Sequence, residues 1–277
     1  MQIMTWQKSV ILILRIDIGV SQVKRDKTND TYFINGEHEL ATFAINRDAV
    51  SGIIKKLYFY DRCEEIPDNV FSGYNDVEEV FLDSSVRRVG RNAFADCKNL
   101  KSVVFSGPVV IESGAFRGCD SLEQVVFPED VQVRDQAFSG CKNLKSVDFH
   151  GATYIDYSAF DYCPSLESVK MDRFVRFTHN DESPVFAKGC PNLKEIGFAD
   201  GCDIIESFTT DWETRQVTHY DTMYMSVFVS ENGTKAKHIS DFANVPSVER
   251  ERDVMYDFLE EYDSDFLDKS HDMKEIE

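Results

Sequence analysis

Two stretches of the chain decide its fold: VGRNAFADCKNLKSVVF at residues 89–105 and VRDQAFSGCKNLKSVDF at residues 133–149. Both carry an Ala-Phe pair, a cysteine three residues after the phenylalanine, and a leucine three residues after the cysteine. These columns recur every 22 residues in four copies, namely Phe94, Phe116, Phe138 and Phe160; Cys97, Cys119, Cys141 and Cys163; and Leu100, Leu122, Leu144 and Leu166. Three columns that stay in step over four copies indicate an internal repeat.

Weaker copies extend the repeat on both sides. Each copy holds three apolar residues in an L-x-x-L-x-L spacing, and the copies read Ile54-Leu57-Phe59, Val77-Val80-Leu82, Leu100-Val103-Phe105, Leu122-Val125-Phe127, Leu144-Val147-Phe149, Leu166-Val169-Met171 and Leu193-Ile196-Phe198. The last two apolar positions are two residues apart, so both point inward from a short strand. The motif and period predict an α/β leucine-rich-repeat solenoid of about seven units over residues 54–200, with short parallel strands on a concave face and turns and short helices on the other side.

The repeat unit resembles the BspA-like leucine-rich repeats, whose signature G-x-x-A-F-x-x-C-x-x-L is matched from Gly90 to Leu100. The resemblance covers about residues 54–200. The Leu-Pro that usually follows the strand is mostly missing, and only Phe127-Pro128 comes near it. The resemblance implies a surface or secreted module for adhesion or interaction.

Residues outside the repeat are expected to cover the ends of the stack, because a solenoid exposes sheet edges. Residues 1–53 predict a β-rich N-terminal cap, with a strand at 10–20 and a hairpin of 32–34 with 39–45 around Asn35-Gly36. Residues 201–277 predict a C-terminal cap with a strand at 220–229, a turn at Asn232-Gly233 and an acidic amphipathic helix after Pro246. We expect this helix to dock on the stack, while a free tail or a partner-binding helix stays open.

The charge of the chain limits the classes of partner. The net charge is −19, from 49 acidic and 30 basic residues. Such a surface repels phosphate backbones and anionic membranes. No apolar run approaches the ~20 residues that span a bilayer, and Arg15 and Asp17 interrupt the only run that is similar to a signal peptide. We therefore expect a basic or neutral partner, no nucleic acid and no membrane insertion.

Seven cysteines raise the question of a metal site or disulfides. Five of them stand in register at positions 97, 119, 141, 163 and 190, and a line of thiols cannot converge on a tetrahedral metal. Cysteine also behaves as a small buried hydrophobe, so we predict buried free thiols, with disulfides between coils as the alternative. Cys63 and Cys202 stay undecided. The six histidines show no metal-site spacing, and we predict no metal, no cofactor and no enzyme activity.

The candidate binding site lies on the predicted strand face, where the residue between the two inward positions points to solvent. An exposed apolar row often marks a binding surface, and aromatic residues often anchor one. The candidate partner-binding residues are Tyr58, Tyr60, Phe81, Val104, Val126, Asp148, His150 and Lys170. The alternative is that the N-terminal cap, or simple strand propensity, accounts for the apolar members.

These features favour a non-catalytic, monomeric protein-binding module that acts through its concave face in adhesion or partner interaction. One alternative is a self-associating structural component of a surface. Another is an ADP-ribosyltransferase-like activity of the C-terminal region, because Glu249-x-Glu251 is similar to the acidic pair of those enzymes; their Ser-Thr-Ser strand is missing, and the first turn of a helix explains both glutamates. The compartment stays open: free thiols and the weak signal favour the cytoplasm, and the resemblance implies the cell surface or secretion.

Overall fold

The computed structural model describes residues 24–26, 30–36, 40, 54–179, 185–200, 202, 204–209, 217–221, 228–231, 235–238 and 241–242. The chain divides into residues 1–246 and residues 247–277, and all described residues belong to the first of these. The expected strand at 10–20, the acidic helix after Pro246 and the Glu249-x-Glu251 pair lie outside the described residues.

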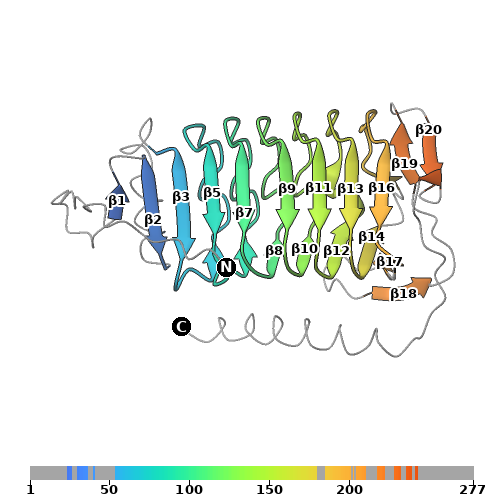
Figure 1. The fold of residues 1–277 in the computed structure, drawn as a ribbon, viewed down its shortest axis with the longest axis horizontal. Helices are drawn as coiled ribbons and strands as arrows, with labels where there is room; N and C mark the ends of the chain where they lie inside the picture. The colour runs from blue at the N-terminus through green and yellow to red at the C-terminus, as the bar shows by residue number, and fades with distance from the viewer. Residues whose placement is uncertain are drawn as a thin grey trace, which may run out of the picture. The chain divides into compact units, whose positions relative to one another are not determined.

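Each coil of the repeat places one short strand on a common face, which we call the strand face. Its repeat strands are β3 (Lys56–Tyr60), β5 (Glu79–Leu82), β7 (Ser102–Phe105), β9 (Gln124–Phe127), β11 (Ser146–Phe149), β13 (Ser168–Met171) and β16 (Glu195–Phe198). They lie side by side and point the same way (Figure 1). Paired strands keep the register of the repeat, so that Val147 faces Val169 and Asp148 faces Lys170. The strands predicted from the L-x-x-L-x-L spacing are confirmed.

The opposite side of the coils carries a second sheet. It consists of β4 (Glu65–Ile66), β6 (Arg88–Val89), β8 (Val109–Ile111), β10 (Val131–Val133), β12 (Thr153–Asp156), β14 (Val175–His179) and β17 (Ile204–Thr209), all parallel, with antiparallel β18 (Val217–Asp221) at its edge. Within residues 54–179 and 185–200, the short helices expected on this side are limited to a 3₁₀ turn, η2 (Tyr157–Phe160). These segments are short and rich in β-branched residues, which favours strands, and they are too short to nucleate helices.

The space between the two sheets is filled by rows of phenylalanine. Phe94, Phe116, Phe138 and Phe160 are fully buried, and their rings stack with nearly parallel planes and successive ring centroids 5.3, 5.2 and 5.5 Å apart. A second row from the strand face meets this one edge-on, as Phe127 does with Phe138 at 6.1 Å. Aromatic rings favour both geometries. The predicted stacking of coil on coil is confirmed.

Two left-handed backbone positions bracket the phenylalanine in each of four coils, and the coil of Phe160 has one such position. Those two residues before it are Asn69, Asn92, Gly114 and Gln136, and those two residues after it are Gly73, Asp96, Gly118, Gly140 and Tyr162, all with φ between 51° and 74°. Glycine, asparagine and aspartate adopt this conformation most easily. Two such residues per coil turn the chain sharply, so a turn and not a helix joins the sheets here.

The ends of the stack differ in part from expectation. Strand β2 (Thr31–Asn35) pairs with β1 (Lys24–Asp26) on one edge and with β3 on the other. Because both edges of β2 are occupied, the expected hairpin of 32–34 with 39–45 is wrong, and the N–H of Leu40 instead donates to the carbonyl of Gly36. At the other end, β19 (Phe228–Glu231) lies between β15 (Val185–Phe186) and antiparallel β20 (Lys235–His238), in agreement with the reversal expected at Asn232-Gly233.

Candidate protein-binding face

The strand face carries a row of outward apolar side chains on its N-terminal strands. Tyr58, Phe81 and Val104 are the middle residues of β3, β5 and β7 and lie in register with one another. Their inward neighbours are buried, whereas Tyr58 and Phe81 are partly exposed and Val104 is 42% exposed. The strand β2 adds Phe33 to the same row, because Phe33 pairs with Tyr58. We call Phe33, Tyr58, Phe81 and Val104 the apolar row.

The aromatic rings of the apolar row stack on one another along the sheet. Tyr58 and Phe81 have ring centroids 4.1 Å apart and an interplanar angle of 9°. Phe33 follows Tyr58 at 5.2 Å with a tilt of 31°. Because the ring faces are turned toward each other, the row presents ring edges to solvent. Burial raises the pKa of the Tyr58 hydroxyl, and a phenol is a hydrogen-bonding group that can donate and accept.

Polar side chains flank the apolar row. Tyr60 lies edge-on to Phe33 at 6.2 Å, which widens the aromatic surface by one ring. On the other flank, the ammonium of Lys56 donates to the carboxylate of Glu79 at 2.9 Å. This hydrogen bond raises the pKa of Lys56. The aromatic surface is therefore bordered by an ion pair.

The strands β9 to β16 continue the outward column with polar residues. Val126 is followed in register by Asp148, Lys170 and Gly197. The amide nitrogen of Gln124 donates to Asp148 at 3.2 Å. In the neighbouring column, Nδ1 of His150 lies 2.5 Å from a carboxylate oxygen of Asp172, and both side chains are about half exposed.

The structure thus separates the candidate residues into two groups. Tyr58, Tyr60 and Phe81 lie together with Val104 at the end of the aromatic surface. Val126, Asp148, Lys170 and His150 lie on the next strands, beyond β7. All of them are at least partly exposed on the strand face.

Sequence reasoning missed two residues of interest. Phe33 was assigned to a separate cap, although Tyr32-Phe33-Ile34 has the same in-out-in pattern as Leu57-Tyr58-Phe59. Tyr162 stands in the left-handed column with φ of 56° and is 56% exposed. Its ring lies over Gly189, where an added Cβ would come within 2.8 Å of Cδ1. Nothing local in the sequence marks this tyrosine as exposed.

A column of alternating charge runs beside the strand face. It consists of the residues that follow the first apolar position of each coil, namely Lys55, Glu78, Lys101, Glu123, Lys145, Glu167 and Lys194. Glu78 is paired with Lys101 at 2.6 Å and with Lys55 at 3.1 Å. The hydrogen bonds from these two lysines lower the pKa of Glu78. Such exposed pairs contribute little individually, but the alternation keeps like charges from stacking.

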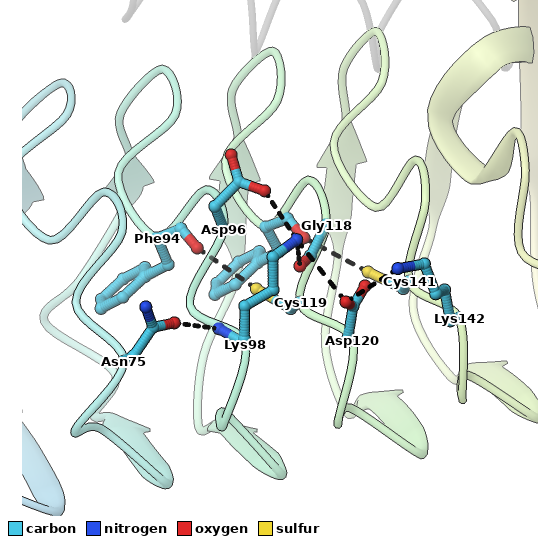
Figure 2. Close-up of polar contacts among 10 residues, drawn as sticks. Asn75, Phe94, Asp96, Lys98, Gly118, Cys119, Asp120, Cys141 and Lys142 are labelled. Carbon is cyan, nitrogen blue, oxygen red and sulfur yellow. Dashed lines mark hydrogen bonds and ion pairs between the residues drawn. The ribbon is translucent and has the colours of Figure 1, made fainter.

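The five cysteines in register, which we call the cysteine row, are buried free thiols, namely Cys97, Cys119, Cys141, Cys163 and Cys190. The thiol of Cys119 donates to the carbonyl of Phe94 at 3.2 Å (Figure 2). The thiol of Cys141 donates to the carbonyl of Phe116 in the same way. Cys97, Cys163 and Cys190 repeat this contact with the preceding coil. Burial raises the pKa of Cys141 to about 12. The prediction of buried free thiols is confirmed, and Cys63 and Cys202 are buried free thiols as well.

The turn edge beside the cysteines is occupied by a small polar cluster. The ammonium of Lys98 lies 2.8 Å from Asp96, 3.0 Å from the carbonyl of Gly118 and 3.6 Å from Asp120 (Figure 2). Asp120 in turn pairs with Lys142 at 3.0 Å. These contacts tie neighbouring coils together. In the described ranges, no group of three or more His, Cys, Asp or Glu residues has the arrangement of a metal site.

Comparison with known proteins gives a family match. The sequence matches the model of the BspA type leucine rich repeat region in six copies, over residues 42–133 and 109–212. No curated protein matches the chain. In the part of the chain that the structure describes, no helix has the length and apolar character needed to cross a membrane.

Three solved structures of bacterial origin are similar to the chain. A leucine-rich-repeat protein of T. pallidum is 23% identical, with 64% of this chain and 78% of that chain covered and a TM-score of 0.41. A leucine-rich-repeat protein of Eubacterium ventriosum is 12% identical over 64% and 76% of the two chains, with a TM-score of 0.26. A leucine-rich cell surface protein of Faecalibacterium prausnitzii is 16% identical over 62% and 72%, with a TM-score of 0.22.

Proposed function

We propose, from the premise that this chain belongs to the BspA-type leucine-rich-repeat family, that it is a non-catalytic module which binds a protein partner through the strand face. Repeat solenoids of this kind are generally interaction or adhesion modules, because stacked coils form an extended surface. The apolar row is the proposed centre of the binding surface, and the polar residues of β11 and β13 are its proposed periphery.

The observation that carries this proposal is the exposure of the apolar row. The inward side chains of β3, β5 and β7 are buried and form the core. The outward aromatic residues are therefore not needed to fill the interior. Strand β2 lengthens the row with Phe33 and does not lie over it. Stacked, partly exposed aromatic side chains beside an exposed valine are typical anchors of protein interfaces.

The geometry of the rings favours a protein partner over a sugar. A sugar ring stacks on the face of an aromatic ring, but the faces of Tyr58 and Phe81 are turned toward each other. Ring edges carry partial positive charge and pack against apolar side chains and carbonyl oxygens, both of which a protein offers. With a net charge of −19 on the chain, a basic or neutral partner is favoured.

The test is capture by the full-length chain with substitutions inside and outside the apolar row. Phe81→Asp with Val104→Asp should reduce recovery of specific partners at least tenfold, because each buries a charge in the proposed interface. The matched control is Gln136→Asp with Asn143→Asp, which adds the same charge at exposed turn positions. Partners are measured by quantitative mass spectrometry, and folding by circular dichroism.

Two outcomes would overturn the proposal. Equal recovery by both double variants would show that the apolar row is not the binding surface. A dimer in light scattering that dissociates with Phe81→Asp would assign the row to self-association. A monomeric parent that loses its partners only with the Phe81 and Val104 changes supports the proposal.

A further inference from the structure

The strand face is interrupted between β7 and β9. Each other pair of successive repeat strands on this face forms a parallel ladder, and these two form none. The flanking contacts are missing as well. Lys101 N–H donates to the carbonyl of Glu78, and Lys145 N–H donates to Glu123. The equivalent bond from Glu123 to Lys101 is not made among the described residues. We call this boundary the seam.

Pro128 stands at the end of the seam. In the other coils the residue after the strand donates its N–H to the preceding coil, as His150 does to Phe127 at 2.9 Å and Ser106 does to Leu82 at 3.0 Å. Pro128 has no N–H to offer to Phe105, and its ring occupies the place of the hydrogen. Proline is tolerated at strand ends and edges but breaks a ladder elsewhere. The proline at position 128 therefore accounts for the missing hydrogen bond to the carbonyl of Phe105.

The two coils that contain β7 and β9 keep their hydrogen bonds on the opposite sheet and at the turns. Strands β8 and β10 pair in full register on the opposite sheet. At the turns, Phe94 N–H donates to the carbonyl of Ala115 at 2.7 Å, and the thiol of Cys119 reaches Phe94. Inside, the rings of Phe105 and Phe127 are tilted by 32°, whereas those of Phe127 and Phe149 differ by 10°. The ring centroids of Phe105 and Phe127 are 4.7 Å apart, so the core stays packed, and the two coils lack only the hydrogen bonds of the strand face.

We infer that the seam is a flexure point, at which the strand face opens and closes about the closed β8–β10 side. Main-chain groups of β7 and β9 that face each other have no ladder partners and are hydrated in the open form. The seam also separates Val104 from Val126 and so divides the candidate binding face. A partner that contacts both valines sets the width of the seam; this consequence alone rests on the proposed function.

Hydrogen–deuterium exchange on the full-length protein tests the inference without any partner. Those amides of residues 123–127 that point toward β7 should exchange about fivefold faster than the equivalent amides of residues 146–149, because a main-chain hydrogen bond contributes roughly 1 kcal/mol. Pro128→His places the residue type of position 150 at the seam and supplies the missing N–H. This variant should slow exchange in residues 123–127 about fivefold to tenfold. Pro128→Ala supplies the same N–H and serves as a second variant.

The reverse substitution provides the matched control. His150→Pro removes the bond to Phe127 and should open a second seam between β9 and β11, seen as faster exchange in residues 146–149. Equal exchange of 123–127 and 146–149 in the parent would overturn the inference. So would unchanged exchange in both Pro128 variants when circular dichroism shows them folded.

Discussion

Each thiol of the cysteine row completes the hydrogen bonding of a phenylalanine carbonyl. The carbonyl of Phe94 accepts the N–H of Cys97 in its own turn and the S–H of Cys119 from the next coil. The carbonyl of Phe116 likewise accepts the N–H of Cys119 and the S–H of Cys141. A buried carbonyl left with unmet hydrogen-bonding capacity costs free energy, and a thiol is small enough to fit between the phenylalanine rows. This explains why cysteine recurs at this position.

Burial of these thiols predicts their reactivity. Because the pKa of Cys141 is raised to about 12 from the ordinary 9.0, its thiolate fraction at pH 8 is lower by a factor of roughly 1,000. We expect Cys141 to resist iodoacetamide in the native protein and to react in guanidinium, as followed by peptide mass mapping. Similar labelling rates in the two conditions would contradict this.

Asp161 is a buried carboxyl group whose ionisation is unfavourable. It is 8% exposed, and burial raises its pKa from 3.8 to about 6, although the N–H of Lys188 donates to it at 2.7 Å. Since the folded-state pKa exceeds the unfolded one, the stability that Asp161 contributes is complete below about pH 4. It is lost as the pH rises toward 6.

The variant Asp161→Asn keeps the acceptor oxygen and removes this ionisation. Relative to the parent, its free energy of unfolding should rise between about pH 4 and pH 7, by an amount on the order of 1–3 kcal/mol. Denaturant titrations at several pH values measure it, with exposed Asp200→Asn as the control. A difference from the parent that does not change with pH would contradict the prediction.

At the scale of the element, the residue types of one repeat unit determine which side chains of its strand point inward and which point outward. Their in-out alternation follows from residue types within one coil, and the predicted inward residues are buried throughout the strand face. The column of alternating charge beside the strands forms ion pairs between neighbouring coils. Because neighbouring strands lie about 4.8 Å apart, like charges in this column would repel each other at close range.

Lys101 is the residue with which to test the alternating column. Lys101→Glu would place three acidic residues in succession at 78, 101 and 123 and should lower the free energy of unfolding by about 1 kcal/mol at low salt. Lys101→Gln removes the pair with Glu78 without adding repulsion and should cost about half as much. High salt should reduce both effects. Equal destabilisation by the two variants at low salt would show that repulsion has no role.

At the scale of the whole molecule, stability is a sum over neighbouring coils, because each coil contacts mainly the one before and the one after. The phenylalanine, cysteine and charged columns all run across these boundaries. The boundary at the seam keeps the core and turn contacts and lacks the ladder of the strand face. The stack is therefore continuous in its interior and divided on the face that we propose binds a partner.

The amino-acid sequence by itself determined the coil length, the inward residues, the buried thiols and the outward position of Tyr58, Phe81 and Val104, because these follow from a local periodicity that is repeated many times. Only the tertiary structure placed Phe33 beside Tyr58, because that contact depends on pairing between segments that share no repeat motif. It also decided that strands occupy the far side and that the ladder of the strand face is interrupted between β7 and β9. Register between strands is a property of two segments together, and no single stretch of sequence contains it.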